Sequence, residues 1–467
     1  MAPIKVGLLG YGFSTKVFHL PYILPNPGYE VYAFLQRSEA PKDKSKVEPG
    51  EHCTVDYPNA KHYRTIEDFC ADPEIQLVSV CTKVGVHVEH AEKALLAGKH
   101  VVVEKPFTTT SAECDHLIEV AKKSGKILTV FQNRRYDSDF LTLKKLFAEK
   151  AFGEVTEFQN HYDCDNPPWM RSTDMGWSPG NGMLFGLGTH SIDQTLLFGK
   201  PKSVTGFLRA LKLRGSETDD TFTVILQYDG EQKDLVCTVK TTVISPLPME
   251  RMLKYMVRGT TGAFVKTGED PQVDHHMAGM KADDPKFGAE PESYYGYLST
   301  TKDSALGESK RVLESERGCY MDYYRDVAKA IRGEVEVVVK PEQSRMGIRV
   351  IELARESAQK GVTLPYSENP LPHIQILITQ EPPHRPLNPT SPQLLCPLPR
   401  IPPITLVINP GQAIDRPHAR HPDLSIRVNE VRQPGLQQRF LRDQELFVPW
   451  ESVGDVSEDV DGADYQC

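Results

Sequence analysis

The sequence lacks several features that mark specialised classes of protein. No apolar run approaches the roughly 18 residues that a membrane-spanning helix needs. The chain of 467 residues has a formal charge of -9, so it has no basic excess to attract nucleic acid or an anionic membrane surface. Its nine cysteines form no CxxC motif and no zinc-site spacing. We therefore expect reduced thiols, no metal, no nucleic-acid or membrane partner, and a small molecule as ligand.

The N-terminus has no room for a signal peptide, because the apolar run begins at Ile4. A cytoplasmic location is therefore expected. Lysine is missing from the other end of the chain: residues 370–467 contain none, but they hold 16 of the 36 prolines. Proline at this density removes backbone N–H donors and blocks helix and sheet. We expect residues 368–467 to be a disordered proline-rich tail, unless they arise from a gene-model error.

Apolar runs alternate with amphipathic segments in the first third of the chain. The expected helix at 110–123 begins at Thr110, with Glu113 at capping-box spacing, and ends at Gly125. Another helix is expected at 87–97, and strands are expected at 4–9, 29–35, 77–82, 101–103 and 127–131. This alternation predicts a parallel sheet covered on both faces, which we assign to a first domain of residues 1–135.

From residue 136 the pattern changes to strands in near succession. The turn at Asp229 and Gly230 is typical of a hairpin. Strands are expected at 155–162, 203–213, 220–228, 235–243 and 251–258, and helices at 139–150, 319–332 and 341–360. The sequence thus predicts a second α/β domain, 136–367, with a large, open, mostly antiparallel sheet. The last apolar run, 362–366, is expected to return to the first domain.

The first expected strand ends in a glycine turn. Gly10 and Gly12 match the start of the dinucleotide fingerprint G-x-G-x-x-G/A, in which the second glycine lets a pyrophosphate approach the backbone. Thr15 occupies the third position, so an ordinary tight turn remains an alternative. The second strand ends at Arg37 and Ser38 without a carboxylate for a ribose hydroxyl. This favours the 2'-phosphate of NADP over NAD, unless Arg37 is a solvated loop charge.

Two later segments carry groups suited to chemistry on a substrate. Lys105 follows an expected strand, where open parallel sheets place their ligands, and can hold a substrate oxygen. His190 and Asp193 lie three residues apart at the start of an expected helix, on one face. A histidine beside a carboxylate can act as a general base near neutral pH. A structural lysine and a helix-capping histidine are the alternatives.

Taken together, these segments resemble the Gfo/Idh/MocA family, named after glucose-fructose oxidoreductase and inositol dehydrogenase. The resemblance extends over about residues 4–366 and is strongest to the branch of NADP-dependent scyllo-inositol dehydrogenases. The matching segments are 6–14, 18–21, 82–87, 97–106, 133–140 and 188–194. The resemblance implies an N-terminal Rossmann domain followed by an α/β domain whose open sheet commonly mediates oligomerisation, so a homo-oligomer is expected.

The resemblance also implies a role for each matched position. Lys105 would be the catalytic lysine, and His190 would exchange the proton of the substrate hydroxyl. The cofactor-binding positions would be Gly10, Gly12, Phe13, Ser14, Thr15, Arg37, Ser38, Thr82, His87, Glu104, Lys105 and Asn133. Tyr162, Arg171 and Asp193 are expected on the substrate side. The implied reaction is hydride transfer between NADP, or NAD, and a polyol, sugar or related hydroxy or carbonyl compound.

One position departs from the family pattern. The family places an aspartate four residues before the histidine, and this chain has Gly186 there. By analogy with the serine-hydrolase triad, loss of a carboxylate that orients an imidazole can cost on the order of 10⁴ in rate. Asp193 could substitute from the next turn of the helix. The alternative to an enzyme is therefore a catalytically silent, dinucleotide-binding regulator of the same fold.

Overall fold

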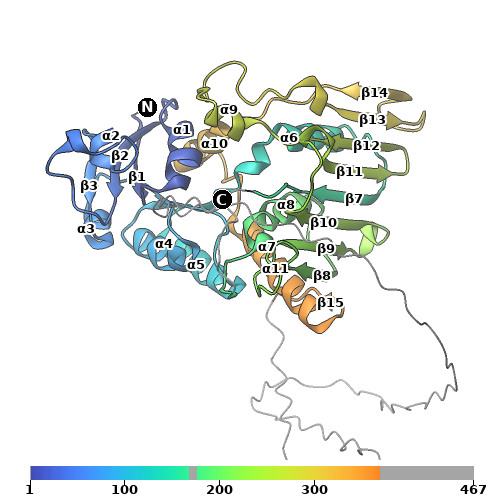
Figure 1. The fold of residues 1–467 in the computed structure, drawn as a ribbon, viewed down its shortest axis with the longest axis horizontal. Helices are drawn as coiled ribbons and strands as arrows, with labels where there is room; N and C mark the ends of the chain where they lie inside the picture. The colour runs from blue at the N-terminus through green and yellow to red at the C-terminus, as the bar shows by residue number, and fades with distance from the viewer. Residues whose placement is uncertain (1, 168–175, 369–467) are drawn as a thin grey trace, which may run out of the picture. The chain divides into compact units, whose positions relative to one another are not determined.

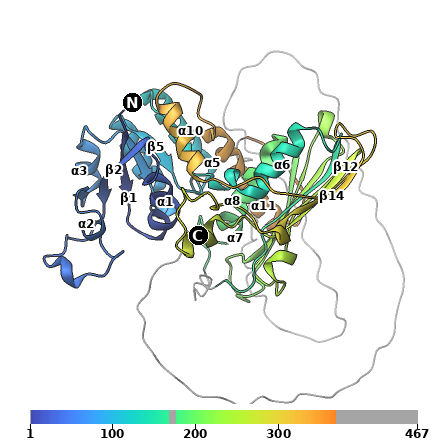
Figure 2. The same cartoon turned by 90° about the horizontal axis from the view of Figure 1, so that it is seen from above.

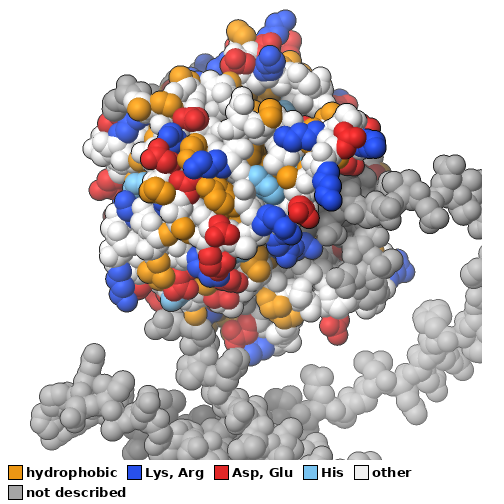
Figure 3. Space-filling model, turned by 90° about the vertical axis from the view of Figure 1, so that its left-hand side faces the viewer, with side chains coloured by type: hydrophobic (Ala, Val, Ile, Leu, Met, Phe, Trp, Pro, Cys, Tyr) orange, Lys and Arg blue, Asp and Glu red, His pale blue; other side chains and the backbone are white. Residues whose placement is uncertain are grey.

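The computed structural model describes residues 2–167 and 176–368. Figure 1 shows two sheets side by side, one of six strands and one of nine. The six-stranded sheet has the order β3-β2-β1-β4-β5-β6, and the nine-stranded sheet has the order β14-β13-β12-β11-β7-β10-β9-β8-β15. Figure 3 shows one face of the first domain, where basic and acidic side chains are intermixed.

Every strand pair of the first sheet is parallel. Its strands are β1 (Ile4–Leu9), β2 (Tyr29–Leu35), β3 (Lys61–Tyr63), β4 (Leu77–Val80), β5 (His100–Val103) and β6 (Leu128–Val130). Its helices are α1 (Leu20–Ile23), α2 (Cys53–Asp56), α3 (Ile66–Ala71), α4 (His87–Leu96) and α5 (Ser111–Ser124). The strand order is that of a doubly wound fold, which binds its ligand where the order reverses, between β1 and β4.

The predicted boundaries of α5 are confirmed. Thr110 and Glu113 form a capping box, and Gly125 ends the helix in the left-handed conformation with φ 63°. The segment after the glycine turn differs from an ordinary helix, because Thr15–His19 form a π-helical turn before α1. Pro21 has no N–H to donate to the carbonyl four residues back, which favours this wider turn. His19 is fully buried as a result.

The second sheet is mixed and mostly antiparallel, as predicted. Its one parallel pair in the described residues joins β7 (Val155–His161) to β10 (Val236–Thr242). The other strands are β8 (Ser203–Arg209), β9 (Thr221–Gln227), β11 (Leu253–Gly259), β12 (Gly262–Thr267), β13 (Gly296–Thr300), β14 (Ser309–Leu313) and β15 (Leu364–Pro365). The strands β12 to β14 extend the sheet beyond those that the sequence indicated.

Helices cover one face of the second sheet. Figure 2 shows α6, α8 and α11 between this sheet and the first domain. The helices of this part are α6 (Ser138–Ala148), α7 (Met183–Gly186), α8 (Gly188–Thr195), α9 (Gln272–Met277), α10 (Met321–Ile331) and α11 (Pro341–Lys360). On the opposite face, Phe207, Tyr297 and Val312 expose their apolar side chains. This face has the alternating pattern of a sheet buried on one side only.

The expectation that the run 362–366 returns to the first domain is wrong. Leu364 pairs with Val204, so β15 is added to the edge of the second sheet beside β8. The first domain is instead joined through α11: Arg345 forms two hydrogen bonds of 2.9 Å with Asp115 of α5. The left-handed Gly361 ends α11 and turns the chain back onto its own sheet.

Candidate active site

The glycine turn after β1 has the geometry that a pyrophosphate requires. Gly10 has φ +102°, a conformation that side chains disfavour, and nothing lies within 4 Å of the position where Gly12 would carry a Cβ. Thr15 occupies the place of the third glycine, and its hydroxyl donates to the Gly10 carbonyl at 2.9 Å. This hydrogen bond stabilises the conformation of the turn. Gly12 leaves open space beside the backbone, just before the helical turn begins, and this space fits a phosphate group.

Two arginines lie at the carboxyl end of β2. Arg37 and Ser38 follow β2 and are both exposed. The Nε of Arg64, just after β3, donates to the Arg37 carbonyl at 3.1 Å. Sequence reasoning missed Arg64, because it predicted neither the short strand β3 before this residue nor the pairing of β3 with β2. Two guanidinium groups at this edge provide donors that suit a phosphate oxygen.

His87 supports the site from within the protein. It is 1% exposed, its Nε2 lies 2.9 Å from the Thr82 carbonyl, and its Nδ1 lies 3.1 Å from the Pro106 carbonyl. Both ring nitrogens therefore face backbone, and the ring joins the end of β4 to the loop after β5. The Thr82 hydroxyl lies 3.2 Å from Nδ1 of His90. The cofactor contact expected for His87 stays a prediction; the structure shows its ring nitrogens in contact with backbone carbonyls.

Glu104 joins the glycine turn to Lys105. Its Oε1 accepts from the Ser14 hydroxyl at 2.5 Å and lies 3.0 Å from Nε2 of His19, while its Oε2 accepts from the Lys105 backbone N–H at 2.7 Å. Burial opposes ionisation, but His19, Lys105 and Ser14 together lower the pKa of Glu104 to about 2. The carboxylate is therefore charged, and it fixes the position of the glycine turn relative to Lys105.

His19 completes this buried network. Its ring lies against Phe131, with centroids 4.3 Å apart, and its Nδ1 lies 3.2 Å from the Ser79 hydroxyl. Burial disfavours the charged ring, yet Cys81 and Glu104 raise the pKa of His19. Sequence reasoning gave this histidine no role, although it lies in the matching segment 18–21. Its function depends on the π-helical turn, which directs the side chain inward.

Lys105 reaches across to the second domain. Its Nζ donates to the carbonyl oxygen of Gly186, the last residue of α7, at 3.2 Å. A Cβ at Gly186 would meet nothing within 4 Å. A side chain could therefore begin at this position without a clash at its Cβ, and a backbone carbonyl is one acceptor beside the lysine.

His190 lies on the first turn of α8, close to these groups. It is 4% exposed, and its Nδ1 is buried without a hydrogen-bond partner among the described residues. Burial, followed by the charges of Lys105, Arg134 and Lys254, holds the pKa of His190 well below its usual range. The imidazole is therefore neutral near pH 7, and it is a weaker base than an ordinary histidine.

Asp193 does not orient His190, contrary to the substitution that the sequence suggested. Its two carboxylate oxygens accept from Nε and Nη2 of Arg135, each at 2.6 Å. This bidentate pair fastens α8 to the short helix of Asn133–Tyr136 that follows the first domain's last strand. Asn133 itself is 4% exposed at the start of that helix.

Two cations lie close to the ring of Tyr162. Its side chain is 5% exposed, and the Arg134 guanidinium and the Lys254 Nζ lie 4.7 Å and 4.0 Å from its ring centroid. The sequence indicated Tyr162 but neither cation. Arg171, also expected on the substrate side, lies outside the described residues.

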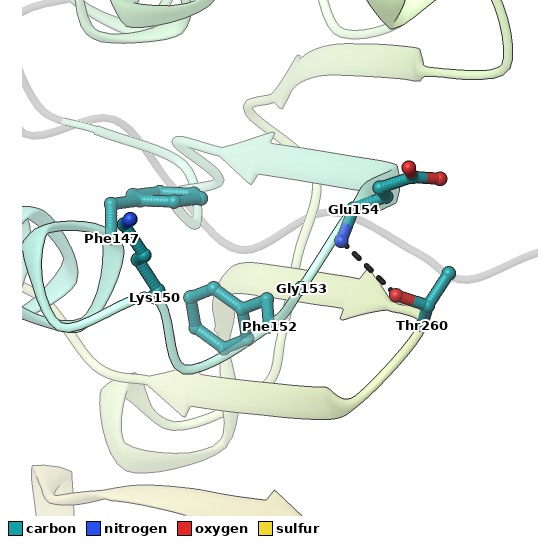
Figure 4. Close-up of a pocket in the computed structure, with 6 residues that line it drawn as sticks. All are labelled: Phe147, Lys150, Phe152, Gly153, Glu154 and Thr260. Atoms are coloured by element: carbon teal, nitrogen blue, oxygen red, sulfur yellow. Dashed lines mark hydrogen bonds between the residues drawn. The ribbon is translucent and has the colours of Figure 1, made fainter. Parts of the chain in front are cut away.

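A separate hollow of about 570 Å³ lies away from these residues, near the end of α6 (Figure 4). Its lining comprises Phe147, Lys150, Phe152, Gly153, Glu154 and Thr260, none of which the sequence indicated as functional. Among the described residues, no group of His, Cys, Asp and Glu side chains is arranged to hold a metal ion. Over the same residues, no helix has the length and apolar character to span a membrane.

Comparison with known proteins identifies the family. Residues 4–132 match the model of an oxidoreductase family with an NAD-binding Rossmann fold, and residues 144–366 match its C-terminal alpha/beta domain. The chain belongs to the Gfo/Idh/MocA oxidoreductase family. The resemblance that the sequence motifs indicated is therefore confirmed, as is the order of a Rossmann domain and an α/β domain with a mixed sheet.

Several members of the Gfo/Idh/MocA family match over most of their length. The NADP-dependent scyllo-inositol 2-dehydrogenase IolW of Bacillus subtilis is 35% identical over 77% of this chain and 95% of its own. An uncharacterized oxidoreductase of Schizosaccharomyces pombe is 36% identical over 79% of this chain and 100% of its own. The solved structure of an oxidoreductase, yvaA, from Bacillus subtilis has a TM-score of 0.70 at 35% identity, covering 79% of this chain and 99% of that one.

Proposed function

We propose that the protein is an NADP-dependent oxidoreductase that acts on the CH–OH group of a polyol, a sugar or a related compound. The observation that carries the proposal is the convergence of Lys105 and His190. Lys105 comes from the first domain and donates to Gly186, four residues before His190 in the second. A lysine that can hold an oxygen and a neutral imidazole that can accept a proton thus lie at one site.

The proposed preference for NADP over NAD depends on the arginines that follow β2 and the neighbouring strand β3. Gly10 and Gly12 would hold the pyrophosphate, and Arg37 with Arg64 would bind the 2'-phosphate. The similarity to IolW, a dehydrogenase named for NADP, supports the same preference. We expect Ser14 and Thr82 to contact the cofactor as well, because the Ser14 hydroxyl donates to Glu104 beside Lys105 and Thr82 lies next to Gly10.

The reacting groups of the protein have separate tasks. Bound nicotinamide supplies the hydride acceptor. The Lys105 ammonium group binds the substrate oxygen and stabilises the alkoxide, and His190 accepts the hydroxyl proton. The alcohol loses one hydride from carbon and one proton from oxygen, and leaves as the carbonyl compound.

Gly186 limits this chemistry without removing it. No side chain at position 186 stabilises protonated His190, and three nearby cations oppose its protonation. We therefore expect slower proton transfer than in a site with an aspartate at this position. Oxidation should accelerate at alkaline pH, where solvent hydroxide assists removal of the proton.

The open face of the second sheet supports a homo-oligomer. Phe207 on β8, Tyr297 on β13 and Val312 on β14 are 52%, 48% and 59% exposed. Apolar side chains exposed on one sheet face are typical of a surface that a second copy covers. Size-exclusion chromatography with light scattering tests this, since Tyr297→Lys should shift the population towards the monomer.

Cofactor fluorescence titration followed by substrate turnover tests the proposed function. NADPH should bind more tightly than NADH, and a panel of polyols and sugars should include a substrate whose oxidation Lys105→Met slows by about 10² or more. Lys123→Met, an exposed lysine on α5, is the matched control. Tight NADPH binding without turnover of any compound would instead identify a silent, dinucleotide-binding regulator.

A further inference from the structure

Gln194 lies one helical turn after His190, on the same face of α8. The residue is 1% exposed. Its amide oxygen Oε1 accepts two hydrogen bonds, one from Nδ2 of Asn160 on β7 at 3.1 Å and one from the Tyr255 hydroxyl on β11 at 2.8 Å. One side chain therefore fastens the helix that carries His190 to two strands of the second sheet.

The amide nitrogen of Gln194 makes a third contact, with the segment that leaves the first domain. Its Nε2 donates to the backbone carbonyl of Arg134 at 2.8 Å. Arg134 belongs to the short helix of Asn133–Tyr136, and the next residue, Arg135, binds Asp193 through two hydrogen bonds of 2.6 Å. Two consecutive residues of α8 thus bind two consecutive residues of this segment.

A primary amide suits this position because it accepts through oxygen and donates through nitrogen. A glutamate could accept from Asn160 and Tyr255, but it would turn a second acceptor towards the Arg134 carbonyl. A methionine would fill a similar volume and form none of the three hydrogen bonds. Loss of hydrogen bonds in a buried place is costly, so removal of the amide should loosen this junction.

The junction also affects the electrostatic surroundings of His190. Among the described residues, the charges that act on its imidazole are Lys105 of the loop after β5, Arg134, and Lys254 of β11. The effect of a charge depends on its distance, so the place of Arg134 relative to α8 matters. Gln194 holds the backbone of Arg134, and the Tyr162 ring lies 4.7 Å from its guanidinium.

We propose that Gln194 is a positioning residue for proton transfer: its amide holds the helix of His190, the backbone of Arg134 and the second sheet in the arrangement that the reaction uses. The inference rests on the proposed function for the reaction itself, but it concerns a side chain that acts through others. A displacement of about 1 Å at a reacting group can cost on the order of 10² in rate. The three hydrogen bonds of Gln194 limit such displacements of His190.

NMR of the full-length protein with ¹³C-labelled histidine tests the inference without a substrate. The His190 signal is assigned by its absence from His190→Asn. In wild type, burial and the three cations should keep the ring neutral from pH 5.5 to 8.5. Gln194→Met should admit water and release Arg134, and because both changes raise the pKa of His190, the ring should take up a proton within this range.

Steady-state kinetics on a substrate from the polyol and sugar screen supply the second readout. Gln194→Met should lower kcat by about tenfold or more, while the NADPH dissociation constant changes by less than about twofold. Thr195→Val is the matched control, because Thr195 is buried on the same helix and its hydroxyl donates to the Ser191 carbonyl at 2.7 Å. This control removes a hydrogen bond within α8, so it should leave the His190 titration and kcat unchanged.

The outcomes separate this inference from the proposed function. A His190 ring that stays neutral in Gln194→Met overturns the inference, as does an unchanged kcat or the same effects in Thr195→Val. Protonation of His190 in Gln194→Met, in a protein that oxidises no compound, supports the inference and contradicts the proposed function. If Gln194→Met does not fold, Tyr255→Phe takes its place, because it removes one hydrogen bond to Gln194. The same change in the His190 titration is then expected, with a loss of about threefold in kcat.

Discussion

The Lys105 ammonium group donates to the carbonyl oxygen of Gly186 at a distance of 3.2 Å. This contact joins the two domains at the point where the family places an aspartate. A neutral backbone carbonyl is therefore the group that this position presents to the lysine. The contact holds the lysine in place, and the charge of Lys105 contributes to the low pKa of His190.

Gly186→Asp should increase oxidation of the substrate. The new Cβ meets nothing within 4 Å, and the backbone lies outside the left-handed region, so the aspartate fits without strain. Its carboxylate would stabilise protonated His190 and raise the pKa of the imidazole. We expect kcat to increase by about tenfold or more, with the alkaline rise of the pH–rate profile shifted accordingly.

Gly186→Asn is the control for this variant, because it has the same shape without the charge. Steady-state kinetics from pH 6 to 10 should show a gain for aspartate alone. Equal rates for Asp, Asn and wild type would mean that His190 does not carry the proton.

The buried His19–Glu104 pair should make stability depend on pH. Burial opposes the charged ring, but Cys81 and Glu104 raise the pKa of His19 from 6.5 to about 10. A raised pKa adds stability below pH 6.5 that is lost as pH rises towards 10. Urea unfolding should show His19→Gln to be about 3 kcal/mol less stable than wild type at pH 6.5. The difference in the free energy of unfolding between His19→Gln and wild type should be smaller at pH 10.

His116 supplies the matched control, because its pair with Glu92 is exposed on the surface. His116→Gln should leave the pH dependence of unfolding unchanged. A constant difference between His19→Gln and wild type from pH 6.5 to 10 would show that the pair is not ionised in the folded protein.

Arg37 and Arg64 should determine the preference for NADP. Each guanidinium at the end of β2 can bind the 2'-phosphate, which NAD lacks. Arg37→Ala and Arg64→Ala should each raise the NADPH dissociation constant by about tenfold, a loss of about 1.4 kcal/mol, with little effect on NADH. Fluorescence titration measures both constants, with the exposed Arg311→Ala as control. Equal weakening of NADH and NADPH would contradict the assignment.

A chain ended after Pro370 should retain the fold and cofactor binding. The described residues up to Glu368 already complete the second sheet, and the Glu368 carboxylate accepts from Arg345 at 2.7 Å. We expect the melting temperature to stay within about 2 °C of the full chain. Differential scanning calorimetry and NADPH titration measure the effect, and a large loss in either would show that residues 371–467 contribute to the folded body.

The regular parts of the fold were predictable because their signals are local. The alternation of apolar runs, the capping box at Thr110 and the stop at Gly125 specify α5 within one residue. The pairing of β15 with β8 could not be predicted in this way, because a two-residue strand has no periodicity of its own. Its place depends on α11, which carries the chain back across the sheet.

The same difference between local signals and long-range contacts decides which parts of the site were predictable. By itself, the sequence determined the family, the order of the two domains, and the positions of Gly10, Lys105 and His190, because these depend on short motifs. Only the tertiary structure decided that Asp193 binds Arg135 and that Lys254 is turned inward by a bulge. Such contacts join residues far apart in the chain, and the free energy of burying a charge depends on every element packed around it.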